Sequence, residues 1–362
     1  MIIRALSLTF LFALSHGAIL GKAFHVYSPS SKENTLWIVK AIPKGESLKL
    51  EVAEKVKFDF SGRVITTHPS KPLLYVTATG GDPGQVPGAV VFLNKDGSYQ
   101  KHQNINFNDG ACYLSLDQEN RHILGVSYGN GRLNVYPLDD QGIPGKAVTT
   151  IDEGKREAHC VLLPPDGKNV YIPYVKGNLA LLQYAYDGNT GKVTPLEPKD
   201  AKPTLGSGPR HMAYHPTLPM VYFSNEQGIG LSTYRREANG QLKVEQDISI
   251  LPPGMSKIGL SASDLLITPD GKFLFAGLRG HRQDFDRISR YRVLEDGKAE
   301  FLGLSEADQI PWGLTLSPDG KFLLVSATTG ASLAAYRISK DGNLKRVATV
   351  AWDERMSDLV AR

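Results

Sequence analysis

The chain has 362 residues, a formal net charge of +4 and two cysteines. So mild a charge, with basic residues spread along the whole chain, argues against nucleic acid as a partner. Two cysteines are too few for a disulfide scaffold. The sequence also lacks the common metal-ligand, phosphate-loop and nucleophile-elbow motifs, so we expect neither a metal nor another cofactor.

The first element in chain order is a leader. It combines Arg4, the apolar run 5–14 and the small residues of SHGA at 15–18. This is the pattern of a secretory signal peptide and is too short to span a bilayer. We therefore predict a signal peptide over residues 1–17, a single domain over residues 18–362, and export to the periplasm or secretion. The alternative is a buried first strand in a protein that stays in the cytoplasm. No other stretch predicts contact with a membrane.

From about residue 24 onward the chain repeats one hairpin six times. Each copy is a turn rich in Pro, Asp and Gly, followed by a short strand of aromatic and β-branched residues. The turns lie 48 to 53 residues apart and are anchored on Pro69, Asp117, Pro165, Pro216, Pro269 and Pro318. A period of this length is typical of an array of similar structural units.

A second series of hairpins alternates with the first. Its turns contain Gly45, Gly97, Gly142, Gly191, Gly240, Gly297 and Gly342. The chain thus has seven outer hairpins but only six complete inner ones. We expect the seventh inner hairpin to be divided between the two ends, with FHVYS (24–28) as its second strand and MSDLVAR (356–362) as its first.

These patterns predict an all-β fold, a seven-bladed β-propeller. Each blade has four antiparallel strands, and the closing blade is shared by the N- and C-terminal strands. Two separate β-sandwiches are the alternative, which we disfavour because the period never breaks and nothing near mid-chain resembles a linker. A closed ring needs no partner, so we expect a monomer.

The repeat also locates a candidate site. In each inner hairpin, the positions six before and ten after the anchor are expected to be cross-strand partners at the open end. Polar residues gather at this level on three consecutive blades, namely His159, Arg210, His211, Glu226, Asp264 and Arg279, and Arg63 lies at the same level elsewhere. The loops at this end are also the variable ones. We therefore predict a ligand pocket at one mouth of the central channel.

Structural interpretations of the same residues remain open. Arg210 and Glu226 could form a salt bridge with no further role, and Arg279 could pair with Asp264. His211 and Asp264 each lie one residue after the selected position of their strands. Because side chains alternate along a strand, both could point away from the channel.

The cysteines are a separate question. Cys112 and Cys160 lie at matching positions of adjacent blades and could face one another. We favour buried free thiols.

Four segments of the sequence resemble those of a known protein family. GSGPRHMAYHP (206–216), SNE (224–226), SDLLITPDGKFLF (263–275) and AHCVLLPPDG (158–167) resemble the seven-bladed propeller lactonase family. That family includes the propeller type of 6-phosphogluconolactonase and the fungal 3-carboxy-cis,cis-muconate cyclase. The resemblance implies that catalysis rests on His159, Arg210, Glu226 and Arg279. The sequence departs from the family pattern at PWG (311–313), where Trp312 replaces an arginine, so phosphate binding stays open.

The leading hypothesis is a cofactor-independent lactonase that acts on a small anionic sugar-acid lactone. Glu226 would be the general base and His159 a second proton-transfer group, while Arg210 and Arg279 hold the anion. His211, Asp264 and Arg63 are expected to contact the substrate. Two alternatives remain, a cycloisomerase of the muconate-cyclase type that forms a lactone, and an exported propeller that binds a ligand or protein without catalysis.

Overall fold

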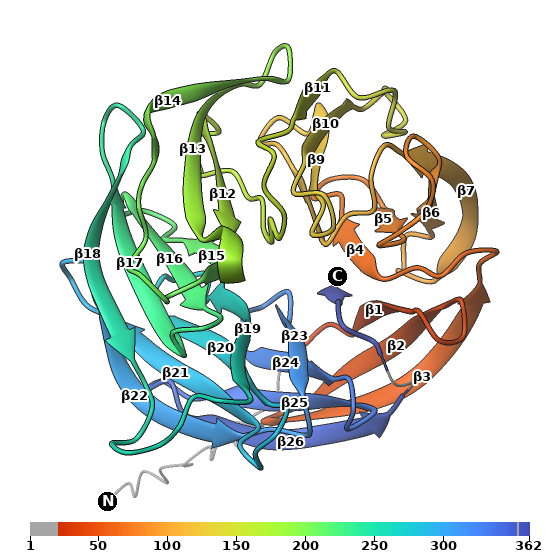
Figure 1. Cartoon of the computed structure of the whole chain (residues 1–362). Helices are drawn as coiled ribbons and strands as arrows, with labels where there is room; N and C mark the ends of the chain where they lie inside the picture. Colours follow the sequence, from red (N-terminus) through yellow and green to blue (C-terminus); the bar gives the residue numbers. More distant parts are fainter. Residues whose placement is uncertain (1–20, 353–354) are drawn as a thin grey trace, which may run out of the picture.

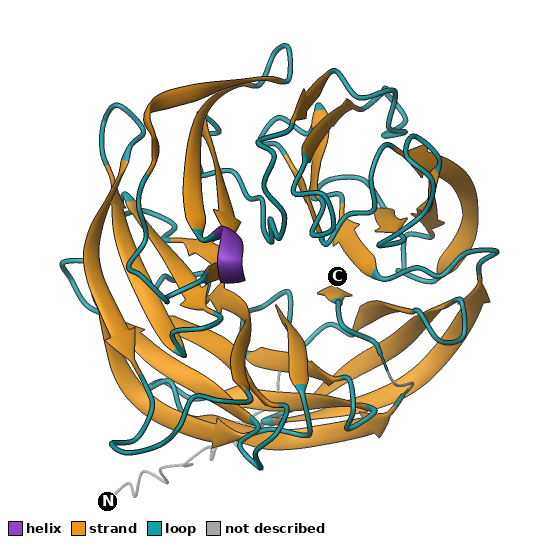
Figure 2. Cartoon of the chain, in the orientation of Figure 1, coloured by secondary structure: helices purple, strands orange, loops and turns teal. Residues whose placement is uncertain are grey.

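The computed structural model describes residues 21–352 and 355–362 and has an all-β architecture. Its strands form seven sheets arranged as blades around a central axis, and the C-terminal end of the chain lies close to that axis (Figure 1). Among these residues the one helical element is a short 3-10 turn, η1 (Lys176–Asn178), beside the centre of the ring (Figure 2). The predicted seven-bladed β-propeller is confirmed. The predicted signal peptide, residues 1–17, lies outside the described residues.

The blades follow one another in chain order around the ring. The first two comprise β27 (Val360–Ala361), β1 (Phe24–Ser30), β2 (Thr35–Lys44) and β3 (Ser47–Lys57), then β4 (Val64–Thr67), β5 (Leu73–Thr77), β6 (Val86–Leu93) and β7 (Tyr99–Phe107). The third and fourth comprise β8 (Tyr113–Leu116), β9 (His122–Val126), β10 (Leu133–Pro137) and β11 (Thr149–Ile151), then β12 (Asn169–Tyr174), β13 (Ala180–Asp187) and β14 (Lys192–Asp200).

The remaining three blades have four strands each. They comprise β15 (Pro209–Tyr214), β16 (Met220–Asn225), β17 (Gly230–Arg236) and β18 (Leu242–Ser249), then β19 (Leu260–Ile267), β20 (Phe273–Gly280), β21 (Arg287–Val293) and β22 (Ala299–Glu306), then β23 (Pro311–Leu316), β24 (Phe322–Ala327), β25 (Ser332–Ile338) and β26 (Leu344–Ala351). In each blade the first strand lies nearest the axis and the last lies at the rim (Figure 1).

The first blade is closed by both ends of the chain, as the sequence predicted. β27 pairs antiparallel with β1, so that Val26 lies opposite Ala361 and Tyr27 opposite Val360. Beyond this ladder, His25 and Arg362 exchange two backbone hydrogen bonds of 2.8 and 2.9 Å. Because the two ends of the chain complete one sheet, the ring cannot open without breaking these hydrogen bonds.

The fourth blade departs from the predicted four strands. Its sheet contains β12, β13 and β14, and the innermost segment is held by a single bridge between Ala158 and Tyr174. The neighbouring residue of β12 is Pro173, which has no N–H to donate, although its carbonyl accepts the His159 N–H at 3.0 Å. A regular ladder therefore stops here, and the segment around His159 stays extended without becoming a strand.

The repeated turn glycines and tyrosines connect neighbouring blades. Tyr27 of the first blade donates its hydroxyl hydrogen to the carbonyl oxygen of Gly97 in the second at 2.6 Å, and Tyr222 does the same to Gly297 in the next blade at 2.8 Å. Gly97 has φ +89°, and a Cβ there would lie 2.6 Å from Nδ1 of His25. A glycine is therefore needed both for the backbone conformation and for the close approach of the preceding blade.

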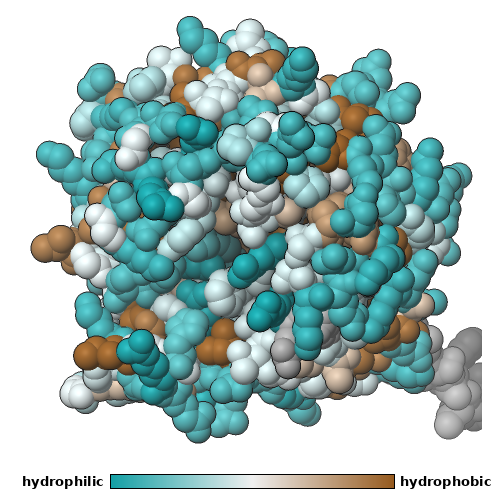
Figure 3. All heavy atoms as spheres, turned by 45° about the vertical axis from the view of Figure 1, so that its right-hand side comes forward, coloured by the Kyte–Doolittle hydropathy of each residue, from teal (hydrophilic) through white to brown (hydrophobic). Residues whose placement is uncertain are grey.

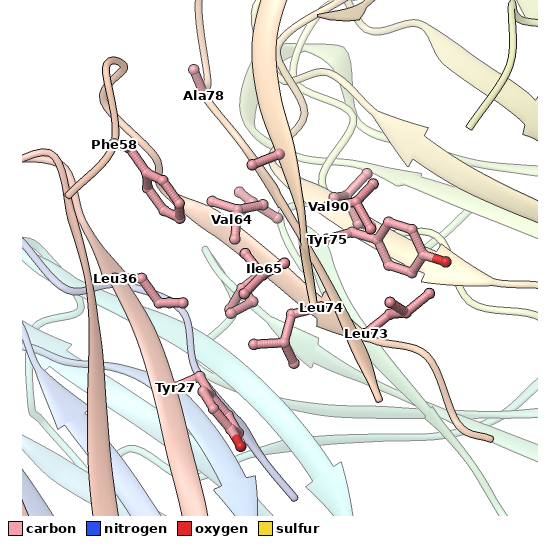
Figure 4. Packing of buried hydrophobic residues seen from close by; sticks show 14 of the residues in the cluster. Tyr27, Leu36, Phe58, Val64, Ile65, Leu73, Leu74, Tyr75, Ala78 and Val90 are labelled. Carbon is pink, nitrogen blue, oxygen red and sulfur yellow. The ribbon is translucent and has the colours of Figure 1, made fainter. Parts of the chain in front are cut away.

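The hydrophobic core lies between the blades. Figure 4 shows one such contact, in which Tyr27 and Leu36 of the first blade face Ile65 and Leu74 of the second. β5 is buried at every position, whereas much of the outer strand β3 is exposed. This gradient is typical of a propeller, because the middle strands are covered on both faces by adjacent blades.

The register of the inner hairpins differs from the prediction. In the fifth blade Pro209 pairs with Asn225 and Met212 with Phe223, so Arg210 and His211 both lie opposite Ser224. The predicted pairing of Arg210 with Glu226 is therefore wrong, and the backbone N–H of Glu226 instead donates to Gly208 at 2.7 Å. Two offsets of one residue each explain the difference. The regular part of the hairpin is already offset by one residue, since Tyr214 pairs with Val221 rather than with Tyr222, and a β-bulge then inserts one residue into the inner strand and redirects its side chains.

The sixth blade carries the same bulge. Ala262 pairs with Leu278 and Leu265 with Ala276, so Ser263 and Asp264 share one partner position. Arg279 consequently pairs with Ser261 rather than with Ser263. Because each bulge re-aims two consecutive side chains, the expected alternation between channel and core does not apply there.

The face of the molecule in Figure 3 is mainly hydrophilic, with apolar residues in small separate groups. Among the residues that the structure describes, Leu205 and Ile258 are the most exposed large apolar ones, with exposed fractions of 93% and 72%. Within residues 21–352 and 355–362, no helix is long and apolar enough to cross a membrane. Isolated apolar side chains of this kind are common on protein surfaces.

Candidate active site

A cavity of about 560 Å³ is lined by residues from the inner ends of several blades. Its lining includes all seven residues that the sequence singled out, namely Arg63, His159, Arg210, His211, Glu226, Asp264 and Arg279. They come from the second, fourth, fifth and sixth blades, and are therefore far apart in the sequence. The bulges in β15 and β19 explain how His211 and Asp264 reach the cavity, although regular alternation would turn them away.

Glu226 lies between two buried arginines. Its Oε2 atom is 3.2 Å from Nε of Arg210, and its Oε1 atom is 3.9 Å from Nη2 of Arg279. Oε2 is also 3.9 Å from Nε2 of His159. Of the predicted alternatives, the contact of Glu226 with Arg210 is therefore present, whereas Asp264 pairs with His211 instead of Arg279.

The contact between Glu226 and Arg210 is an ion pair without an aligned hydrogen bond. Oε2 of Glu226 and both Nε and Nη1 of Arg210 are buried and have no hydrogen-bond partner among the described residues. Arg210 is only 1% exposed. Since buried polar atoms are normally satisfied, these groups retain the capacity to bind a polar ligand.

The second arginine, Arg279, makes one hydrogen bond to the backbone. Nη2 of Arg279 donates to the carbonyl oxygen of Ala262 at 2.8 Å. Burial, and then the charge of Arg210, lower the pKa of Arg279. Two guanidinium groups thus share one carboxylate in a buried place, and an anionic ligand would relieve their repulsion.

Trp312 lies at the centre of the arginines. Its ring centroid is 4.3 Å from Cζ of Arg279 and 5.9 Å from Cζ of Arg63 and of Arg210. Trp312 lies in a bulge of β23 between Pro311 and Leu314, and its side chain lines the cavity. The indole attracts the three cations through its π-face and orients them without neutralising their charge.

Two of the histidines that line the cavity, His159 and His211, are adjacent and uncharged at neutral pH. Their ring centroids are 5.1 Å apart. Burial, followed by the charge of Arg210, lowers the pKa of His159 well below its usual value. The same two causes lower the pKa of His211 to about 4, although the carboxylate of Asp264 opposes them. Nδ1 of His211 lies 2.7 Å from Oδ1 of Asp264.

The sequence did not predict Tyr128 and Lys176, which also line the cavity. Nζ of Lys176 lies 5.3 Å from the ring centroid of Tyr128, and a hydrogen bond with Tyr128 raises the pKa of this lysine. The two residues stand one position beyond Ser127 and Val175, the positions that the repeat had selected. Lys176 has φ +55°, a conformation that a residue other than glycine rarely adopts and that the spacing of the repeat cannot reveal.

Asp358 was also missed, although the sequence carries a signal for it. Ser357-Asp358-Leu359 repeats Ser263-Asp264-Leu265, but the chain ends before the turn that would have anchored it. Oδ2 of Asp358 accepts the Ile65 N–H at 2.8 Å, just as Oδ2 of Asp264 accepts the Leu314 N–H. Burial, with the nearby charge of Asp264, raises the pKa of Asp358 to about 8.

The cysteines are free thiols in the part of the chain that the structure describes. Cys160 is buried, whereas Cys112 is partly exposed and lines the cavity. Although part of its surface faces the cavity, the protein packed around the Cys112 thiol removes it from bulk water and raises its pKa to about 12, so this thiol stays protonated and is a weak nucleophile. Among the described residues, no group of three His, Cys, Asp or Glu side chains is arranged to hold a metal ion.

Comparison with known proteins gives consistent results over nearly the whole chain. Residues 30–357 match the family described as lactonase, 7-bladed beta-propeller. The chain is 27% identical over 320 residues to a 6-phosphogluconolactonase of Klebsiella pneumoniae, which covers 88% of this chain and 91% of that one. A 6-phosphogluconolactonase of Pectobacterium carotovorum is 27% identical over 336 residues, with coverage of 90% and 94%.

Solved structures support the same fold. A periplasmic gluconolactonase of Pseudomonas aeruginosa superposes with a TM-score of 0.81 at 20% identity, covering 94% of this chain and 99% of that one. A putative 6-phosphogluconolactonase of Bacteroides fragilis gives a TM-score of 0.79 at 18% identity, with coverage of 94% and 98%. At these identities the structural likeness concerns the fold alone.

Proposed function

The chain belongs to the seven-bladed β-propeller lactonase family, and on that premise we propose that it hydrolyses the lactone of a small anionic sugar acid. The observation that carries this proposal is the arrangement of Glu226 between Arg210 and Arg279 in a cavity of about 560 Å³. The cavity has room for a six-carbon lactone, and its buried donors lack partners among the described residues.

Enzymatic hydrolysis of a lactone needs a proton acceptor, a proton donor and stabilisation of the negative charge that develops on the carbonyl oxygen. The water oxygen adds to the carbonyl carbon while Glu226 takes one of its protons. The negative charge that develops on the carbonyl oxygen is stabilised by the guanidinium groups of Arg210 and Arg279. The bond from the carbonyl carbon to the ring oxygen then breaks, and the proton returns from Glu226 to that oxygen. His159, at 3.9 Å from Glu226, is the second candidate for this transfer.

Two further cations support an anionic substrate. Nε of Arg63 donates to the hydroxyl oxygen of Ser357 at 3.3 Å, and no carboxylate among the described residues forms an ion pair with this arginine. Lys176 adds another charge to the lining of the same cavity. A carboxylate or phosphate on the substrate would be attracted by both. We therefore include a phosphorylated lactone among the candidate substrates, although Trp312 stands where the family pattern has an arginine.

A substrate panel tests the proposal. Purified protein is mixed with glucono-δ-lactone, 6-phosphoglucono-δ-lactone and 3-carboxy-cis,cis-muconate, and proton release and diene absorbance are followed. We expect at least one of the two sugar lactones to be opened well above its spontaneous rate. Loss of diene absorbance without lactone opening would instead identify a cycloisomerase. Binding of these compounds without any turnover would identify a propeller that binds without catalysis, and would refute the proposal.

A further inference from the structure

We propose that His211, held by Asp264, is a fixed hydrogen-bond acceptor for a hydroxyl group of the substrate, and that the site thereby selects polyhydroxylated ligands. This inference rests on the proposed function, because it assigns the group that distinguishes a sugar lactone from one without hydroxyl groups. It goes further in naming one atom, Nε2 of His211, as the source of that selection.

Asp264 fixes the tautomer of His211. Its Oδ1 atom accepts the Leu265 N–H at 2.8 Å, and its Oδ2 atom accepts the Leu314 N–H at 2.8 Å. Although burial opposes ionisation, His211 and these hydrogen bonds lower the pKa of Asp264, so the group is a carboxylate. A carboxylate only accepts hydrogen bonds, and Nδ1 of His211 must therefore carry the proton that it donates to Oδ1. Nε2 is consequently left with its lone pair.

The position of His211 places this lone pair in the wall of the cavity. The residue lines the cavity and is 8% exposed, and its Nε2 atom is buried without a hydrogen-bond partner in the described parts of the chain. Its ring is held between those of Tyr113 and His159, each with its centroid at 5.1 Å. The acceptor is therefore fixed in place before any ligand arrives.

The charged groups around His211 keep it an acceptor over the working pH range. Arg210 and Arg279 disfavour the imidazolium, the carboxylate of Asp264 favours it, and the pKa of about 4 is the result of these charges together with burial. Nε2 of His211 would become a donor only below about pH 4, where the imidazole gains a second proton. By contrast, no carboxylate fixes the tautomer of His159, whose Nδ1 is buried without a partner among the same residues.

The cavity thus combines two kinds of group with different partners. Arg63, Arg210, Arg279 and Lys176 are donors that suit carboxylate, phosphate or carbonyl oxygens. His211 suits a donor, and a sugar hydroxyl can provide one. A ligand without hydroxyl groups would leave a buried acceptor unpaired, which costs about 10- to 100-fold in affinity.

Binding of two acids by calorimetry tests the inference separately from catalysis. D-gluconate and hexanoate have the same chain length and carboxylate, but only gluconate has hydroxyl groups. We expect the wild-type protein to prefer gluconate and His211→Phe to lose about 10- to 100-fold of that preference. His211→Gln, which restores a side-chain acceptor, should recover part of it. Circular dichroism and the melting temperature establish that each variant is folded.

Asp264→Asn and Asp117→Asn form a matched pair of variants. Both aspartates hold a histidine through its Nδ1 atom, since Nδ1 of His122 lies 2.9 Å from Oδ2 of Asp117, but only Asp264 lines the cavity. We expect Asp264→Asn to weaken the gluconate preference and Asp117→Asn to retain it.

Three results would overturn the inference. These are equal binding of the two acids by the wild type, binding of neither, or an unchanged preference in His211→Phe. Failure of the proposed function is a different result, namely the absence of lactone turnover in the substrate panel.

Discussion

At the scale of single residues, the buried charges of the candidate site lower the stability of the folded protein but allow it to bind an anion. Arg210 and Arg279 are both buried and both face one carboxylate, that of Glu226. An arrangement with more buried positive than negative charge is unfavourable without an anion, because each ion loses its hydration. Strain of this kind is typical of binding sites, where the ligand completes the charge balance.

Replacement of Arg279 tests this balance. Arg279→Met removes the charge that Arg210 repels and keeps much of the side-chain volume over Trp312. We expect the free energy of unfolding to rise by on the order of 1–3 kcal/mol while lactone turnover falls at least about 100-fold. Urea denaturation and steady-state kinetics measure the two effects. A variant that is both less stable and fully active would contradict this description of the site.

The site residues show which contacts could be predicted from the sequence and which could not. The convergence of His159, Arg210, Glu226 and Arg279 on one cavity was predicted from the spacing of the repeat. The contact of His211 with Asp264 was not, because both residues lie in bulges and the repeat assumes a regular ladder. A bulge inserts one residue without changing the hydrophobic pattern on either side, so the sequence carries little signal for it.

At the scale of elements, the closing strand serves both the ring and the cavity. β27 completes the first blade. Asp358 lies two residues before this strand and accepts a backbone hydrogen bond from Ile65 in the second blade. The same aspartate lines the cavity beside Asp264. The end of the chain therefore contributes directly to the wall of the candidate site.

Asp358 makes stability depend on pH. Its pKa is about 8 in the folded protein and near 3.9 in an unfolded chain, so the folded state binds more protons between these values. The contribution to stability is therefore present below about pH 4 and is lost as the pH rises through 8. Asp358→Asn carries no titratable proton and resembles the protonated acid. We expect this variant to reduce the decline in unfolding free energy between pH 5 and 8.5, measured by urea denaturation.

The control for this experiment is Glu51→Gln, an exposed substitution on β3. Glu51 is far from the closing strand in the sheet order, since β1 and β2 separate β3 from β27. This variant should leave the pH profile unchanged. If Asp358→Asn and the wild type decline in parallel, the pKa assigned to Asp358 is wrong.

At the scale of the whole molecule, repetition made the fold predictable. Seven turn glycines and six inner anchors were sufficient to predict the number of blades and the division of the first blade between the two ends. Tyrosine contacts such as Tyr27 with Gly97 explain in physical terms why the pattern recurs, because each blade is fastened to the next one at the same place.

Local exceptions to the repeat were less predictable. The fourth blade lacks a regular inner strand because Pro173 cannot donate to it, and Lys176 adopts a left-handed conformation beside the cavity. Both of these exceptions lie at the candidate site, since His159 and Lys176 line the cavity. A ring of similar blades can form a pocket of dissimilar side chains only where its members differ from the repeat.

The most direct test of the central claim is the rate of glucono-δ-lactone and 6-phosphoglucono-δ-lactone opening by Glu226→Gln, measured by proton release at constant pH. Glu51→Gln serves as the matched control, since it makes the same chemical change on the surface. We predict that Glu226→Gln keeps its fold but loses at least about 100-fold of the wild-type rate on the lactone that the wild type opens, while the control loses none. A Glu226→Gln protein as active as the wild type would contradict the assignment of this cavity as the active site.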